Sequence, residues 1–331
     1  MANYDVLDGL QQAVIEEEQK KQSSKKKEYS FDKLALLFME DYEVKGIKVS
    51  QPTIGDILRV GESNFYQALS PFLYNSTSIR VMLWEAGIDW CNVKDIEVFD
   101  ILNNIQKQNK ELTNAIISDD TFNEEDTTTC RKSKISKIKS WFLRLFKKNK
   151  NTEESKNINN SILEKEIFPL KILFKNIDIT DFQLYKEKET EDSEEKLCLY
   201  SSTYDIKLYE EDYMQIAEYI REMLNIHPKV EKAKGKTAKR WMIDEDKMNA
   251  LHRDEKNIST LLPLVSACVN HPGFKYKLQE LREVGIYQFM DSVQRLQIYE
   301  SSRALLQGSY SGFCDTSKVP QDNFNFMRDI S

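Results

Sequence analysis

Histidines and cysteines are the residues of this 331-residue sequence that could bind a metal or act as nucleophiles. None of the three histidines has a second histidine or a cysteine at the spacing of a zinc site, so we predict surface or structural roles for them. The five cysteines are widely separated, which fits neither a disulfide framework nor a zinc knuckle. These residues are His227, His252, His271, Cys91, Cys130, Cys198, Cys268 and Cys314. The sequence therefore predicts no metal site.

One short stretch is similar to a catalytic motif. Residues 252–256, HRDEK, resemble the catalytic loop of a protein kinase, but the sequence lacks the glycine-rich loop, the strand lysine and the DFG-type metal site of kinases. We interpret this stretch as the polar face of a charged helix. The sequence also lacks the GxxxxGK[ST] and strand-borne GxGxxG patterns of nucleotide sites. We therefore predict no catalytic residue and no cofactor, and expect that the chain is not an enzyme.

A basic amphipathic segment lies at residues 131–150, which contain nine Lys and Arg residues and no acidic residue. Ile135, Ile138, Phe142 and Leu145 fall on one face if this segment is helical. Such a segment can fold back onto acidic neighbours, dock on an acidic partner, or contact an anionic membrane or nucleic acid, and the sequence leaves these readings open. Its candidate contact residues are Lys134, Lys137, Lys139, Trp141, Phe142, Arg144, Phe146 and Lys147.

Composition limits the class of protein. The net charge of the chain is −7. Without the nine cations of the basic segment, the remaining residues carry −7 − 9 = −16. So acidic a chain is not expected to bind phosphate backbones in general. The 16 Phe, 15 Tyr and 4 Trp predict a folded core, while only 10 Gly and 7 Pro favour long helices over many tight turns. We see neither a signal sequence nor an apolar run of about 18 residues, and expect a soluble protein of a reducing cytoplasm.

These patterns predict an α+β fold that is mainly helical. We expect a small N-terminal β-hairpin, short strands in the middle of the chain, a helical C-terminal half and a long charged insertion. The expected regions are a polar, frayed leader at 1–27, a hairpin with helices at 28–106, a charged and disordered insertion at 107–160, and an α+β region at 161–331 that ends in a long helix and a docked tail. The insertion is predicted to divide the chain in two, because its polar and charged blocks cannot bury enough apolar area to offset ordering entropy.

The predicted elements follow from local signals. Residues 31–53 contain two β-like stretches around Lys45-Gly46, and Thr53 is the predicted N-cap of a helix that ends at Gly61. Further helices are predicted at 65–73, 79–87, 96–105, 162–174 and 213–224, with strands near 182–185, 197–200 and 206–208. A charged surface helix at 236–256, a buried helix at 261–269 capped by Ser259 and a last helix from 286 to 308 complete the prediction.

Two stretches resemble proteins from the tail gene cluster of tailed phages that infect low-GC Gram-positive bacteria. The first is residues 47–99, with QPTIG at 51–55, a tyrosine-bearing helix and GIDW at 87–90. The second runs from Lys232 to the end through KAKGKTAKRWMIDEDK, LLPLVSACVNHPGFKY, IYQFMDSVQRLQ, LLQGSYSGF and DNFNFM. Together they cover about half of the chain, and the charged insertion between them departs from the pattern.

The resemblance implies a tail assembly chaperone that acts in the host cytoplasm and shields an aggregation-prone tail component, such as the tape-measure or tube protein. The alternatives are a structural tail or baseplate subunit of the virion, and an adaptor that contacts membrane or nucleic acid through residues 131–150. Self-association is a further option. We expect partner contacts from apolar residues of three elements, with ordinary core packing as the alternative for each. They are Phe65, Tyr66, Leu69, Trp84, Trp90, Phe289, Val293 and Leu296.

Overall fold

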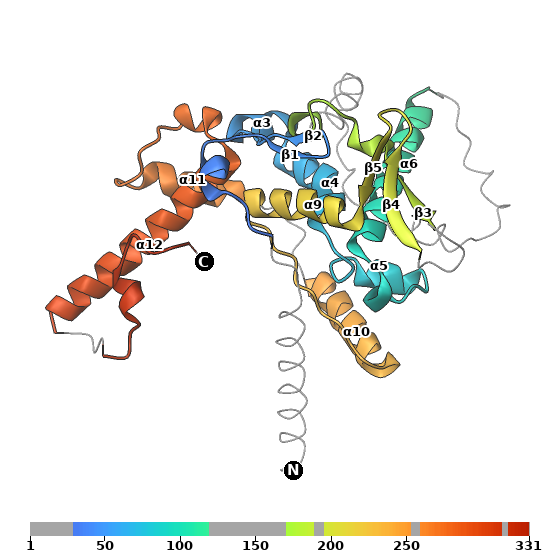
Figure 1. Ribbon diagram of the computed structural model, residues 1–331. Coiled ribbons are helices and arrows are strands. Elements are labelled where there is room, and N and C mark those ends of the chain that lie inside the picture. The colour runs from blue at the N-terminus through green and yellow to red at the C-terminus, as the bar shows by residue number, and fades with distance from the viewer. Residues whose placement is uncertain (1–28, 119–169, 189–194, 253–258, 313–316, 331) are drawn as a thin grey trace, which may run out of the picture.

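A computed structural model describes residues 29–118, 170–188, 195–252, 259–312 and 317–330. The chain is a mainly helical α+β protein, which confirms the predicted fold class. Figure 1 shows a body of helices and two small sheets, from which α11 and α12 project to one side. We call residues 259–330 the arm and the remaining described residues the body. The predicted leader at 1–27 and the basic segment at 131–150 lie outside the described residues.

The predicted hairpin is present near the start of the body. Strand β1 (Tyr42–Val44) pairs antiparallel with β2 (Ile47–Val49). Lys45 and Gly46 join them with φ values of 49° and 81°, the positive angles that a tight type I′ turn requires and that glycine adopts without strain. The two apolar side chains of β2 are fully buried, so the hairpin packs one face on the core.

A short helix precedes the hairpin, where the sequence pattern had favoured extended structure. Helix α2 spans Lys33–Leu37, and the Asp32 side chain caps it by accepting hydrogen bonds from the backbone N–H groups of Leu34 and Ala35. The prediction of β-like structure is wrong for these residues. A local aspartate cap satisfies the free N–H groups of a helix, which gives the backbone an alternative to strand pairing.

Four helices follow the hairpin at the predicted places. They are α3 (Ile54–Val60), α4 (Glu62–Leu73), α5 (Arg80–Glu85) and α6 (Asp95–Ser118), with a 3₁₀ turn at Trp90–Asn92. Thr53 caps α3 in a reciprocal capping box with Asp56, and Gly61 ends the helix, as predicted. Helix α6 passes the predicted boundary at residue 106, because residues 107–118 contain good helix formers and neither glycine nor proline.

The second sheet lies in the middle of the chain. Strands β3 (Gln183–Glu187), β4 (Lys196–Ser201) and β5 (Ile206–Tyr209) form an antiparallel sheet in that order and confirm the three predicted strands. Their register aligns Leu184, Leu199 and Leu208 on the face that packs toward α6 and the following helix α9 (Glu210–Leu224). Of the helix predicted at 162–174, only residues 170–174 are described, and residues 170–173 are helical.

One large core unites the two halves of the chain. The Phe72 ring contacts Phe99 at 5.2 Å and Phe174 at 5.4 Å between centroids, and Phe99 contacts Tyr213 at 5.5 Å. These rings come from both sides of the predicted insertion. The predicted division of the chain in two at the insertion does not hold for the core, because the aromatic rings of α4, α6 and α9 pack against one another and against Phe174.

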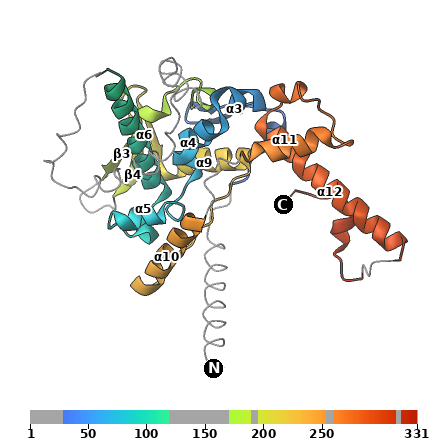
Figure 2. The same cartoon turned by 180° about the vertical axis from the view of Figure 1, so that it is seen from behind.

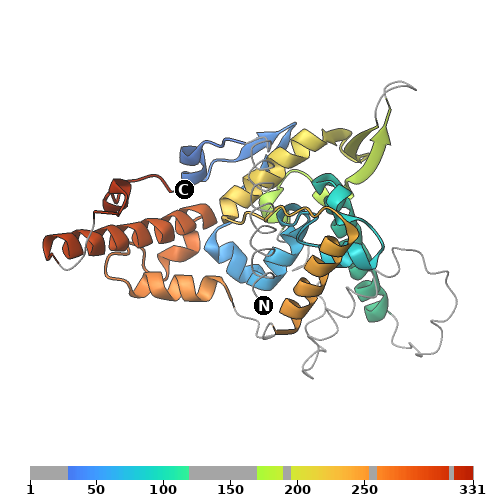
Figure 3. The ribbon, with the colours of Figure 1, turned by 90° about the horizontal axis from the view of Figure 1, so that it is seen from below.

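The remaining helices lie toward the C-terminus. They are α10 (Lys236–His252), α11 (Leu261–Asn270), a 3₁₀ turn at Glu280–Glu283, α12 (Ile286–Tyr310) and a 3₁₀ turn, η4, at Gln321–Phe324. Figures 2 and 3 show α12 leading away from the body. The prediction of a buried helix at 261–269 is wrong: only Leu261 and Cys268 of α11 are buried, because the helix packs on one side alone. Helix α12 also continues through Gly308, where we predicted its end.

The C-terminal tail folds back along α12, whereas we predicted that its apolar side chains dock on the body. The Ser302 hydroxyl donates a hydrogen bond to the backbone carbonyl of Asn323 at 2.9 Å, and Arg295 Nη1 donates to the carbonyl of Arg328 at 2.5 Å. The Phe326 ring meets Tyr299 edge-on at 5.9 Å between centroids. The tail is thus held largely through its backbone, and its apolar side chains remain partly exposed.

Candidate protein-interaction site

Two backbone hydrogen bonds join the arm to the body. The Ile54 N–H donates to the carbonyl of Val284 and the Ile286 N–H donates to the carbonyl of Pro52, both at 2.9 Å. Thr53 and Gly285 consequently face each other as an antiparallel bridge. We call this contact the seam. Residues 47–99 and the segment after Lys232 meet here, so the seam fixes how the arm projects.

The QPTIG residues at 51–55 hold the backbone at and next to the seam. The Gln51 side chain donates a hydrogen bond to the carbonyl of Leu36 at 2.8 Å, and the next three residues supply the bridge and the cap of α3. At Gly55, an added Cβ atom would lie 2.7 Å from the carbonyl oxygen of Arg282. Only glycine allows α3 and the turn at Glu280–Glu283 to approach this closely.

A carboxylate of the body holds the start of α11. Glu62, the first residue of α4, accepts hydrogen bonds from the backbone N–H groups of Thr260 at 2.8 Å and Leu261 at 3.2 Å, and from the hydroxyls of Ser259 and Thr260. It therefore caps α11 from another helix. Partial burial would raise the pKa of Glu62, but these hydrogen bonds outweigh burial and hold the pKa below its ordinary value of 4.5.

We expect the variant Glu62→Gln to lower the free energy of unfolding by about 1–2 kcal/mol at neutral pH, because an amide accepts these bonds without charge. A carboxylate with a lowered folded-state pKa stabilises the fold fully above pH 4.5 and loses that contribution as pH falls through the folded-state pKa. The difference between wild type and variant should therefore shrink in acid. Urea unfolding at several pH values measures it, and a difference that stays constant with pH would contradict this assignment.

A groove of about 620 Å³ lies along the proximal half of α12. One wall is formed by the end of α2 and the loop after α11, and the tail closes the distal end. The apolar lining consists of Leu37, Phe38, Phe274, Tyr276, Leu296, Tyr299 and Phe326. The Phe38 side chain is 71% exposed and Phe326 is 50% exposed, so these rings face solvent. Aromatic rings in an open groove are typical of polypeptide-binding surfaces.

The polar floor of the groove comes from one face of α12. The Gln288 side chain forms its hydrogen bonds within the protein. Its Nε2 donates to the carbonyl of Leu37 at 2.6 Å, and its Oε1 accepts from the N–H of Gly285 at 3.2 Å. Ser292 donates its hydroxyl to the carbonyl of Gln288, and Arg295 binds the tail. Asp291 differs: it accepts no hydrogen bond and forms no ion pair among the described residues, although it is partly buried.

Charge also distinguishes the arm from the body. Residues 259–330 contain seven basic and seven acidic side chains, so the arm has no net charge although the chain carries −7. The arm nevertheless exposes many large apolar side chains: Leu262, Tyr276, Leu278, Tyr299, Tyr310, Phe326 and Met327. A surface without net charge that exposes many aromatic residues is typical of contacts between proteins.

Most of the predicted contact residues are in the core. The side chains of Phe65, Leu69, Trp90, Phe289 and Val293 are buried, so the prediction that they form an exposed contact surface is wrong for the folded chain. Tyr66 is half-buried against the large core, and Trp84 is half-buried against a separate cluster of buried apolar residues that includes Trp90. Of the eight residues, Leu296 alone lines the groove. Helical periodicity identifies apolar faces, but it does not say which faces the rest of the chain covers.

The rings that line the groove were missed by sequence reasoning. Phe38, Tyr276 and Tyr299 come from segments that are far apart in the chain, and Phe326 was predicted only to dock. One signal was available: Gln288, with residues 291, 292, 295, 296 and 299, follows the spacing of a single helical face of α12. That face mixes polar and apolar residues, which is why it did not stand out.

A second exposed apolar set lies on α10. Trp241 is 78% exposed, and Met248 and Leu251 are also exposed on this predicted surface helix. The opposite face is fixed to the body by buried Ile243 and by ion pairs such as Lys239 Nζ to Asp89 Oδ2 at 2.6 Å. The helix is therefore well anchored, and none of its residues lines the groove along α12.

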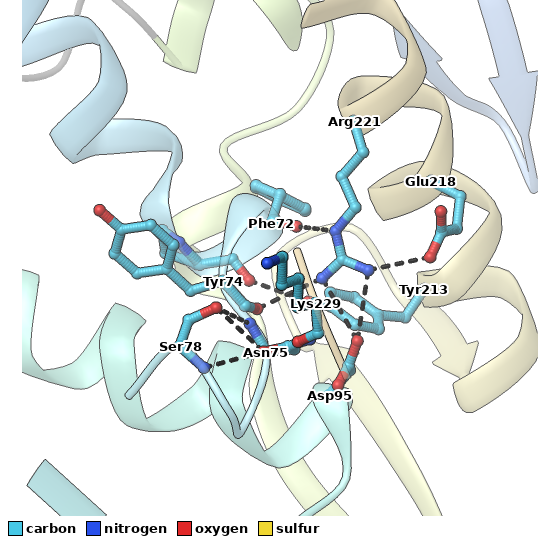
Figure 4. Close-up of polar contacts among 10 residues, drawn as sticks. Phe72, Tyr74, Asn75, Ser78, Asp95, Tyr213, Glu218, Arg221 and Lys229 are labelled. Atoms are coloured by element: carbon cyan, nitrogen blue, oxygen red, sulfur yellow. Dashed lines mark hydrogen bonds and ion pairs between the residues drawn. The ribbon is translucent and has the colours of Figure 1, made fainter. Parts of the chain in front are cut away.

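The most buried charged group of the body is Arg221 of α9. Figure 4 shows its guanidinium between the end of α4 and the start of α6. Its Nε donates to the carbonyl of Phe72 at 2.8 Å, and its remaining nitrogens contact Asp95, Glu218 and the carbonyl of Tyr74. The side chain is 1% exposed. No substrate reaches it, so we assign it to the fold.

Histidine, cysteine and acidic side chains are the residues that could hold a metal ion. No group of three or more histidine, cysteine or acidic side chains that could hold a metal is found among them. His271 accepts a hydrogen bond at Nδ1 from the N–H of Gly273, and its Nε2 lies 3.4 Å from Glu300 Oε1. These contacts give His271 a structural role, because they fix the loop after α11 to α12. Within the same residues, no helix is both long and apolar enough to cross a membrane.

The predicted basic segment at 131–150, with its contact residues between Lys134 and Lys147, lies outside the described residues. The same holds for Arg253–Lys256 of the kinase-like stretch. No protein-family model, curated protein or solved structure matches this chain.

Proposed function

We propose that this chain is a phage tail-morphogenesis protein that binds another polypeptide in the groove of its arm, as an assembly chaperone does. The groove, with its exposed rings on an arm that has no net charge, is the observation that carries this proposal. The resemblance of residues 47–99 and of the C-terminal segment to tail-cluster proteins supplies the biological setting. We propose no catalytic step and no cofactor.

The arm suits a chaperone for physical reasons. Its groove offers apolar area to a client segment, while the acidic body keeps the complex soluble by repulsion between like charges. The seam and the Glu62 cap hold the arm in place, so little ordering entropy is lost when a client binds. Candidate clients are the tape-measure and tube proteins.

Affinity purification of the tagged chain from infected cells tests this function. We expect recovery of a tape-measure or tube protein, and at least about tenfold lower recovery with Phe38→Glu or Phe326→Glu, because a charge in a desolvated groove opposes docking. The matched control is Tyr310→Glu, which alters an 85% exposed ring on α12 outside the groove. Equal recovery with all three variants would contradict the groove as the binding site.

Mass spectrometry of purified particles separates the chaperone from a virion subunit. A chaperone is absent from the mature tail, whereas a tail or baseplate subunit is present in a fixed copy number. Presence in fixed copy number would replace the chaperone role with a structural one and leave the groove as a contact within the tail.

A further inference from the structure

The polar side chains on the groove floor form hydrogen bonds within the protein, with one exception among the described residues. Gln288 bonds at both ends of its amide, and Ser292 and Arg295 donate to backbone carbonyls. The Asp291 carboxylate has no such partner among the described residues, and it faces the groove from the same helix face. A segment that fills the groove must therefore either satisfy this carboxylate or bury it without a donor.

Nearby cations do not fully balance Asp291. Burial raises the pKa of its carboxyl above the ordinary value, and the attraction of Arg295 and Lys33 reverses only part of that effect. Both cations also bind the tail: Arg295 donates to the Arg328 carbonyl at 2.5 Å, and Lys33 donates to the Ile330 carbonyl at 3.5 Å. Lys275, the other cation of the lining, is exposed in a loop.

We propose that the groove selects an apolar polypeptide segment that carries one lysine or arginine, whose cationic group pairs with Asp291 while its neighbours pack against Phe38, Tyr299 and Phe326. This proposal rests on the function proposed above and names the chemistry of the client. A neutral segment would desolvate the carboxylate without compensation, and an acidic segment would place like charges together. The carboxylate therefore gives specificity, and the rings supply most of the contact area.

The dimensions fit a short segment. Floor residues extend from Gln288 to Tyr299, which corresponds to about 16 Å along the helix. Such a length accommodates about five residues in extended conformation, or about three turns of a helix. Asp291 lies about one helical turn from the end of the groove that is next to the body. The cationic residue of the client should therefore stand before or after a run of apolar residues, and not in the middle of that run.

Selection from a library of random 12-residue peptides, displayed on their encoding nucleic acid and bound to the purified full chain, tests the proposal. We expect enriched peptides to combine apolar residues with one Lys or Arg. Against Asp291→Asn the basic preference should vanish, and against Asp291→Lys it should change to an acidic one. The consensus peptide should bind Asp291→Asn at least about tenfold more weakly in a titration, and urea midpoints of the variants check their folding.

The possible results separate the two proposals. Peptides that depend on Phe38 and Phe326 but show no basic preference, or the same consensus with Asp291→Lys, would overturn the inference and leave the groove as a binding site. A library without any peptide that depends on those rings would overturn both. Self-association of the chain that is lost with Phe326→Glu would identify a second copy as the occupant and also overturn the inference.

Discussion

Replacing Arg221 with alanine is expected to lower the free energy of unfolding by about 3–5 kcal/mol, a large share of the about 5–15 kcal/mol that stabilises most domains. The guanidinium is buried and links three helices, through the carbonyl of Phe72, Asp95 of α6 and Glu218 of its own helix. Removing it takes the guanidinium away from the Asp95 and Glu218 carboxylates and from the backbone carbonyls of Phe72 and Tyr74 at the C-terminal end of α4. Urea unfolding followed by circular dichroism measures the loss.

Two variants test the cause of that loss. Arg221→Met keeps most of the side-chain volume, so a similar loss in this variant assigns the effect to the polar network and excludes a cavity effect. Arg240→Ala removes a 76% exposed arginine that pairs with Asp244 at 3.7 Å, and should cost less than about 0.5 kcal/mol. Equal losses for the Arg221 and Arg240 variants would show that the buried network contributes little.

Local signals predicted much of the fold. The cap at Thr53, the stop at Gly61 and the Lys45-Gly46 turn act over a few residues, so single-sequence reasoning located them correctly. Long-range burial was harder to predict. The sequence of α11 is apolar enough for a buried helix, but nothing in it reveals that only one side is covered. The aromatic contact between Phe72 and Phe174 likewise joins segments that composition had assigned to separate regions.

The candidate site was less predictable than the fold. Its rings come from α2, from the loop after α11, from α12 and from the tail, which meet only because the seam holds the arm against the body. Residues that were predicted from apolar periodicity, such as Phe65 and Phe289, are fully buried in the core. Exposed rings just after a short helix or in a tail carry no periodic signal, so a structure was required to find them.

Replacing Gly55 with alanine is expected to destabilise the chain by about 2–4 kcal/mol, although alanine favours a helix over glycine by up to about 1 kcal/mol. The new Cβ would lie 2.7 Å from the Arg282 carbonyl oxygen and 3.3 Å from the Arg282 Cβ atom, so α3 and the turn at Glu280–Glu283 must separate. Overpacking of this kind costs about 1–3 kcal/mol, and the seam hydrogen bonds of Ile54 and Ile286 weaken as the backbones move apart.

Hydrogen exchange locates that effect. The amides of Ile54 and Ile286 should exchange faster in Gly55→Ala, because both donate across the seam. The matched control is Gly87→Ala: Gly87 has a φ of +74° and no neighbour within 4 Å of an added Cβ, so this variant strains a turn without touching the seam. It should leave the exchange of both amides unchanged. A more stable Gly55→Ala protein with unchanged exchange would mean that helix propensity outweighs close packing here, and that the arm is positioned by the Glu62 cap and the contacts of α12.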